Sequence, residues 1–159
     1  MTGYFDVAPR VPHSGDAEAM RAIVWNSLGV TPYVDRTIEL LDAAERGDPD
    51  SRALLIERDG TVAALALFGP IAGTAGTWRL AAALVAPPLE PEEVGPVIME
   101  AVVSAARASG GRLLVAELAD DVALGRSLAL LQSSGFSEEG RVRDFYRGGV
   151  ALIFLRREI

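Results

Sequence analysis

The sequence predicts a mixed α/β fold, in which a sheet of about seven strands is flanked by about four helices. The hydrophobic period changes along the chain, from helical spacing before residue 47 to extended apolar runs after residue 52. Two turn signals, Arg58-Asp59-Gly60 and Gly148-Gly149, indicate hairpins of antiparallel strands. Residues 78–101 read as a buried strand, a Pro-rich turn and a long helix. The strand that follows at residue 112 indicates a right-handed crossover to a parallel neighbour.

The first third of the chain is expected to contain one strand and two helices. Residues 4–11 have the apolar content of a strand. Ser14 is placed to cap a helix that runs to about residue 28, with acidic side chains in its first turn, where they suit the helix dipole. Thr31 followed by Pro32 predicts the start of a second helix, which ends at Gly47.

The remaining two thirds are expected to supply six strands and two helices. A meander of three strands precedes a long helix with apolar residues at helical spacing, and a strand, a helix and a hairpin close the chain. Trp78, at the start of the third strand of the meander, is expected to anchor the core. The expected strands cover residues 53–57, 62–68, 77–85, 112–118, 141–147 and 150–156, and the expected helices cover 92–109 and about 120–134. The order is therefore β-α-α-β-β-β-α-β-α-β-β.

Composition excludes several classes of function. The chain has 159 residues, half of them apolar, so we expect one domain over residues 1–159. It has no cysteine and a single histidine, which excludes a thiolate or multi-histidine metal centre and a cysteine nucleophile. That histidine, His13, is expected to be solvated or to cap a helix. The net charge of −7 argues against a nucleic-acid partner. Apolar runs fall short of the ~20 residues that span a bilayer, so we expect a cytoplasmic protein without membrane association.

Several fragments carry a family resemblance. They are G-T-W-R-L at 76–80, L-V-A-P at 84–87, G-G-R-L-L-V-A-E at 110–117, G-F-S-E-E-G-R-V-R-D-F-Y at 135–146 and L-I-F-L-R at 152–156. With the order of elements, they resemble the GNAT superfamily of acyl-CoA-dependent N-acyltransferases. The resemblance is close from about residue 52 to residue 157 and loose before that.

The resemblance implies a site for acetyl-CoA as cosubstrate. The strand 77–85 would splay from the parallel strand 112–118, and the acyl-CoA would lie in this V-shaped opening. Backbone groups at the end of the first strand would pair with the pantetheine, and N–H groups at the start of the following helix would hold the pyrophosphate, because a helix N-terminus has unpaired donors and a positive dipole end. The positions assigned in this way are Leu84, Val85, Val94, Gly95 and Val97.

The resemblance also implies direct attack of a primary amine, carried by a small molecule or a peptide, on the thioester. Glu117, at the end of the parallel strand, is the candidate general base or amine-binding carboxylate, and Tyr146 is the candidate acid. The family's usual acid is a tyrosine at the position that Leu131 occupies here. Two alternatives stay open. Glu117 could make a structural hydrogen bond, and Tyr146 could pack in the core with its hydroxyl in contact with water.

The chain departs from the family at the pyrophosphate loop. Gln or Arg and alternating glycines are common there, whereas this chain has Glu90, Pro91 and Glu93 before Gly95. An alternative function is therefore a divergent GNAT-fold binding or interaction module that has lost CoA binding. Homodimerisation through the last strands is a possibility that the sequence leaves open. The arginines that could supply cations to the phosphates, or form a solvated face, are Arg126, Arg141, Arg143 and Arg147.

Overall fold

The computed structural model describes residues 8–159. They form a seven-stranded sheet in the order β1-β2-β3-β4-β5-β7-β6, in which β4 and β5 are parallel and all other neighbours are antiparallel. The strands are β1 (Pro9–Arg10), β2 (Arg52–Arg58), β3 (Thr61–Pro70), β4 (Thr77–Val85), β5 (Leu113–Ala119), β6 (Ser137–Arg147) and β7 (Val150–Glu158). The helices are α1 (Ala17–Leu28), α2 (Val34–Glu45), α3 (Pro91–Ala108) and α4 (Gly125–Ser133). The predicted mixed sheet and order of elements are confirmed.

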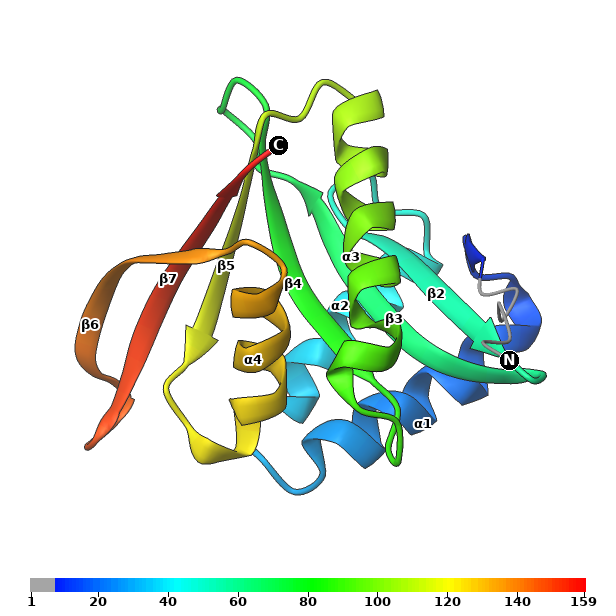
Figure 1. Cartoon of the computed structure of the whole chain (residues 1–159), viewed down its shortest axis with the longest axis horizontal. Coiled ribbons are helices and arrows are strands. Elements are labelled where there is room, and N and C mark those ends of the chain that lie inside the picture. Colours follow the sequence, from blue (N-terminus) through cyan, green and yellow to red (C-terminus); the bar gives the residue numbers. More distant parts are fainter. Residues whose placement is uncertain (1–7) are drawn as a thin grey trace, which may run out of the picture.

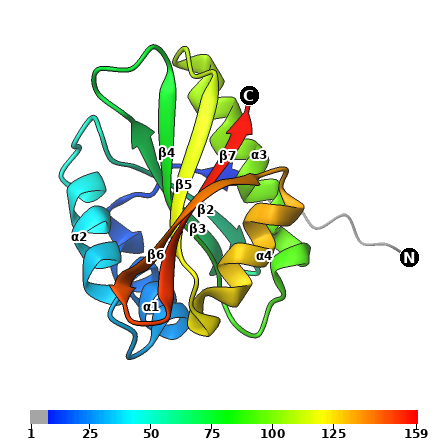
Figure 2. The ribbon, with the colours of Figure 1, turned by 90° about the vertical axis from the view of Figure 1, so that its left-hand side faces the viewer.

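Helices cover both faces of the sheet. Helices α3 and α4 lie on one face, and α1 and α2 lie on the other (Figures 1 and 2). Each face has its own cluster of buried side chains, one around α3 and the other around α1 and α2. Strand β3 lies between these clusters and is buried along nearly its whole length, which explains its continuous apolar run. None of the helices among residues 8–159 is long and apolar enough to cross a membrane.

Strands β4 and β5 pair over three residues and then separate. Their register ends at Arg79↔Val115, while β5 continues along β7 as far as Ala119↔Leu152. Figure 1 shows the two strands close at the upper end and apart at the lower end. At the joined end Trp78 is buried, its ring centroid 6.0 Å from that of Phe68. The predicted splay and the predicted core role of Trp78 are both confirmed.

Several predicted boundaries were wrong. Of the strand expected at residues 4–11, only Pro9–Arg10 is a strand among the described residues, and residues 1–7 lie outside them. A 3₁₀ turn, Ser14–Asp16, precedes α1, and His13 rather than Ser14 is its N-cap, because the His13 Nδ1 accepts from the Gly15 N–H at 3.2 Å.

The second helix and the sixth strand also begin elsewhere than expected. Residues 31–33 form a turn, in which the Val34 N–H donates to the Thr31 carbonyl, so α2 begins at Val34 rather than at Pro32. Strand β6 begins at Ser137 rather than at residue 141, because Ser137 and Glu138 already pair with β7.

An ion-pair cluster holds the first strand to the first helix. The carboxylate of Asp16 accepts from both terminal nitrogens of Arg10, at 2.7 and 2.9 Å, and from the His13 N–H at 2.8 Å. Arg10 also donates to Glu57 of β2 at 2.8 Å. The hydrogen bond with Arg10 holds the pKa of the buried Asp16 carboxyl well below its usual range.

We predict that Asp16→Asn destabilises the fold in a pH-dependent manner. Because the folded pKa is lowered, the contribution of Asp16 is fully present above its unfolded pKa of about 3.9 and is lost as the pH falls through the folded pKa. Urea unfolding of the wild-type protein and of Asp16→Asn at pH 7 and at pH 3 measures this contribution to the free energy of unfolding. The wild-type protein should be more stable than Asp16→Asn at pH 7, and the difference should shrink at pH 3. An equal difference at both pH values would contradict the assignment.

Candidate functional site

A cavity of about 450 Å³ occupies the opening between β4 and β5. Side chains from both faces of the sheet contribute to it, so the cavity passes through the sheet where the two strands have separated. Helix α2 lines one side of it and α4 lines the other. The lining residues from the separated strands are Leu80–Leu84 of β4 and Ala116–Ala119 of β5. The region that the sequence assigned to the thioester is therefore an open space in the structure.

Glu117 and Tyr146 both line this cavity, so the structure brings the two predicted catalytic residues to one site. Burial raises the pKa of Tyr146 above that of an ordinary phenol, and the negative charge of Glu117 and the nearby Tyr33 raise it further. Tyr146 therefore keeps its proton at neutral pH and can donate it. The carboxylate of Glu117 lies 3.7 Å from Arg79, and both side chains are well exposed, so this pair is weak.

A polar cluster at the mouth of the cavity was missed by the sequence analysis. The Tyr33 hydroxyl donates to the carboxylate of Asp121 at 2.9 Å, and Arg147 donates to the same oxygen at 2.9 Å. The pKa of Asp121 is lowered by the backbone N–H of Ala123, by Arg147 and by Tyr33. Tyr33 also contacts Tyr146 edge-to-face, with ring centroids 5.8 Å apart. The three residues of the cluster come from parts of the chain that are far apart in the sequence, and no short sequence motif predicts that they meet.

Apolar side chains make most of the cavity wall. Leu131, at the position of the family's usual tyrosine, is buried and contributes to the lining. It carries no proton to donate, which leaves Tyr33 and Tyr146 as the phenols of the cavity. The hydroxyl of Tyr33 is committed to Asp121. Among the lining residues, Tyr146 is therefore the better proton donor.

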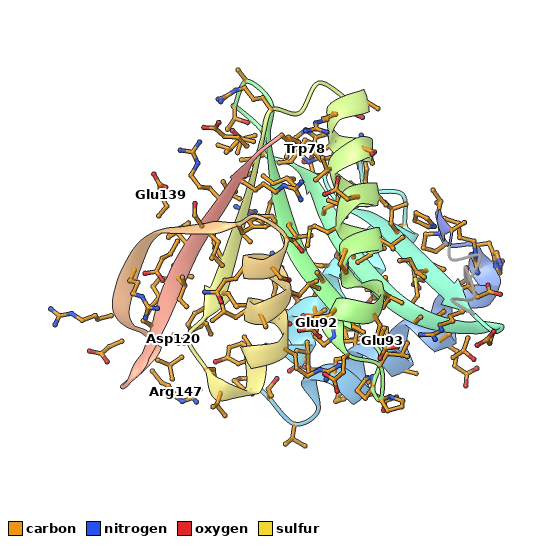
Figure 3. The ribbon with its side chains drawn as sticks, viewed as in Figure 1. Trp78, Glu92, Glu93, Asp120, Glu139 and Arg147 are labelled. Carbon is orange, nitrogen blue, oxygen red and sulfur yellow. The ribbon has the colours of Figure 1, made fainter. Side chains whose placement is uncertain are left out.

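The start of α3 is closed by its own acidic side chains. Glu93 accepts from the backbone N–H of Glu90 at 3.0 Å and from Arg58 at 3.0 Å, and these two contacts lower the pKa of Glu93. Arg126 of α4 donates to Glu90 at 3.2 Å and to the carbonyl of Leu89. Figure 3 shows Glu92 and Glu93 at this lower end of α3. Of the four arginines considered as phosphate ligands, Arg126 alone contacts this loop, since Arg141 pairs with Glu138 and Asp120.

The five positions assigned to acyl-CoA are distributed over two elements. Leu84 lines the cavity, and Val85 ends β4 next to it. Val94 is buried against the core, whereas Val97 is exposed on α3. Gly95 has a packing role of its own, because a Cβ at this position would lie 2.2 Å from Cδ1 of Leu130. Whether acyl-CoA contacts these residues stays a prediction.

A second, narrow cavity of about 30 Å³ adjoins the first. It is lined by Val85, by Pro91 at the start of α3 and by Arg126 of α4, and it shares Leu84 with the larger cavity. Ser27 of α1 lines it too, and the buried Ser27 hydroxyl has no hydrogen-bond partner among the described residues. A buried polar atom without a partner is uncommon and points to an absent ligand or solvent molecule. A polar group therefore lines the small cavity, between the larger cavity and the start of α3.

Comparison with known proteins identifies the fold. No protein-family model and no curated protein sequence match the chain. A solved protein from Desulfovibrio desulfuricans, described as an acetyltransferase of the GNAT family, is 29% identical with a TM-score of 0.84, over 96% of this chain and 98% of that one. The ribosomal-protein-alanine N-acetyltransferase from Brucella melitensis is 22% identical with a TM-score of 0.74, over 95% and 99%. A Salmonella typhimurium acetyltransferase-like protein, solved with acetyl-CoA, is 19% identical with a TM-score of 0.73, over 96% and 93%.

The mixed sheet with one splayed parallel pair is the GNAT fold. The likeness to the Desulfovibrio desulfuricans protein along almost the whole of both chains supports membership of the GNAT superfamily.

We predict that Gly95→Ala lowers the free energy of unfolding by roughly 1–3 kcal/mol, because the added methyl group overpacks the contact with Leu130. Alanine is otherwise the better helix residue by about 1 kcal/mol. Gly125→Ala is the matched control, since nothing lies within 4 Å of a Cβ there. In a Leu130→Ala background, Gly95→Ala should be neutral or stabilising. Chemical denaturation of the four variants measures this, and an equal loss in both backgrounds would contradict the packing role.

Proposed function

We propose that the chain is a cytoplasmic N-acetyltransferase, which transfers the acetyl group of acetyl-CoA to a primary amine of a small molecule or peptide. The observation that carries this proposal is the cavity through the β4–β5 opening, which holds Glu117 and Tyr146 together. The likeness to solved acetyltransferases along almost the whole chain supports it.

The edge of β4 that faces the opening would hold the donor. Beyond Arg79 no strand of the described part of the chain lies beside this edge, so alternate backbone groups between residues 80 and 85 are available to a ligand. The pantetheine amides would pair with this edge near Leu84 and Val85, and the Ser27 hydroxyl would contribute one further hydrogen bond. Acetyl-CoA supplies an acyl group activated as a thioester.

Glu117 would accept a proton in the reaction, and Tyr146 would donate one. The Glu117 carboxylate attracts the protonated amine and accepts a proton from it, directly or through water, so that the neutral nitrogen can form the new C–N bond. The C–S bond breaks, and the Tyr146 hydroxyl donates its proton to the departing sulfur. The raised pKa of Tyr146 keeps that proton in place at neutral pH.

Arg126 would supply the cation for the pyrophosphate. Its pair with Glu90 is exposed, and exposed ion pairs contribute little to stability, so a phosphate can replace the carboxylate as its partner. The carboxylates at the start of α3 oppose this exchange, and Pro91 has no N–H to donate. The affinity for acetyl-CoA should therefore be modest.

A second candidate is a GNAT-fold interaction module that does not bind CoA. The contacts at the start of α3 favour the interaction module, because the Glu93 carboxylate already accepts from the Glu90 N–H and is itself paired with Arg58. Isothermal titration with acetyl-CoA separates the two functions. Binding supports the acetyltransferase, whereas no heat at near-millimolar ligand leaves the interaction module.

We predict that Ser27→Ala weakens acetyl-CoA binding without destabilising the free protein. The substitution removes a buried hydroxyl that has no partner, so the free energy of unfolding should stay the same or rise slightly. Loss of one hydrogen bond to the pantetheine should raise the Kd about 5- to 10-fold, for a bond of about 1 kcal/mol. Titration with acetyl-CoA and thermal unfolding of both proteins measure the two effects. An unchanged Kd would show that Ser27 does not contact acetyl-CoA.

We predict that Glu117→Gln lowers kcat by at least about 100-fold, the usual contribution of a general base, and that Tyr146→Phe lowers it less, because a thiolate is a good leaving group. Both variants should bind acetyl-CoA with the wild-type Kd. Steady-state kinetics across pH measure this. A Glu117→Gln variant with the wild-type kcat and pH profile would assign Glu117 a structural role.

A further inference from the structure

We propose that the acceptor of this enzyme is a primary amine carried by an apolar body without a carboxylate beside the amine, such as an alkylamine or an arylalkylamine. This inference rests on the proposed function and names the substrate class of the same cavity. Three observations carry it, namely the charge of the lining residues, the apolar wall and the apolar rim of the mouth.

The charges in the cavity favour a cation and give an anion no free partner. Among residues 8–159, Glu117 is the one carboxylate that lines the cavity, and its contact with Arg79 is long, at 3.7 Å. The two lining cations have partners at hydrogen-bond distance. Arg147 donates to Asp121 at 2.9 Å, and Arg36 donates to Glu39 at 3.0 Å. An ammonium group therefore finds a carboxylate to pair with, whereas a substrate carboxylate would have to compete for an arginine.

The wall that would contact the rest of the acceptor is apolar. Twelve of the twenty lining residues are leucine or alanine, and they come from the α1–α2 region, both separated strands, and α4 with the turn before it. Leu131 extends this wall into the position where the family's usual tyrosine would bring a hydroxyl. The acetyl group and the pantetheine beside β4 would fill one part of a cavity of about 450 Å³. The remaining space suits hydrocarbon better than the hydroxyls or charges of a sugar or a polyamine.

Exposed apolar side chains continue this surface outside the cavity. Val122 follows Asp121 of the mouth cluster and is 98% exposed. Phe145 is 57% exposed, and its ring centroid lies 5.0 Å from that of Tyr146, which lines the cavity. The loops that form the mouth lie together at the lower end of the molecule in Figure 1, and Figure 3 shows Arg147 there. Apolar residues gathered at the rim of a cavity indicate a surface that contacts a ligand.

The test compares acceptors that differ by one feature. Acetylation of 2-phenylethylamine and of phenylalanine compares the same amine without and with a carboxylate, and n-alkylamines from ethylamine to hexylamine vary the apolar body. We expect kcat/KM for 2-phenylethylamine to exceed that for phenylalanine at least 10-fold. We also expect it to rise about 3- to 4-fold per methylene along the alkylamines, since each buried methylene contributes about that factor. Preference for phenylalanine or for spermidine, or a flat series, would overturn the inference.

Variants of exposed residues on β6 test whether the rim of the cavity contacts the apolar body of the amine. Phe145→Ala should lower kcat/KM for hexylamine at least 3-fold while leaving that for ethylamine within a factor of two. Val142→Ala, at another exposed apolar position of β6 that does not line the cavity, is the control and should change neither value. Equal effects of Phe145→Ala on both amines would contradict contact of the rim with the apolar body.

Binding without the donor separates this inference from the proposed function. A thermal-shift titration with 2-phenylethylamine and with phenylalanine requires no acetyl-CoA. If acetyl-CoA does not bind but 2-phenylethylamine does, the acetyltransferase proposal fails and the assignment of the cavity to apolar amines stands. If acetyl-CoA binds but 2-phenylethylamine neither binds nor is acetylated, the acceptor inference fails alone.

Discussion

The short pairing between β4 and β5 is the constraint on which the rest of the site depends. Backbone N–H and C=O groups inside a protein need partners, and in a sheet a neighbouring strand supplies them. Here β5 pairs with β7 over its whole length but with β4 over three residues. The edge of β4 beyond Arg79 therefore lies beside a cavity rather than beside a strand. A ligand with alternating amide groups can complete that edge, as another strand would.

The packing at the two ends of the opening keeps it in place. At the joined end, buried Trp78 lies beside Phe68, and the guanidinium of Arg52 lies 4.7 Å from the centre of its indole. At the separated end, α4 packs on one face of β4 and α2 on the other, while β5 is held by its pairing with β7. The Tyr33–Asp121 hydrogen bond then links α2 to the connection after β5. The opening is thus a supported part of the fold.

The order of elements could be predicted because it follows from local patterns, whereas the splay of β4 from β5 was implied by the family resemblance. Alternating and continuous apolar runs define strands, and Arg58-Asp59-Gly60 defines a hairpin, whichever residues lie across the sheet. The candidate site depended on family resemblance, which placed Glu117 and Tyr146 at one cavity. The hydrogen bond between Tyr33 and Asp121 could not be predicted from the sequence, because the two residues are 88 positions apart and neither belongs to a motif that indicates a distant partner. The same holds for Gly95, which the family resemblance assigned to the pyrophosphate site and whose contact with Leu130 exists only in the folded chain.

A crystal structure of the protein with acetyl-CoA tests the central claim most directly, since that claim concerns where the donor lies. The account predicts the acetyl thioester in the opening between β4 and β5, with the pantetheine paired to the edge of β4 near Leu84 and Val85 and with Arg126 turned from Glu90 toward the phosphates. The thioester located elsewhere on the surface, or β4 left without a ligand at saturating acetyl-CoA, would contradict it.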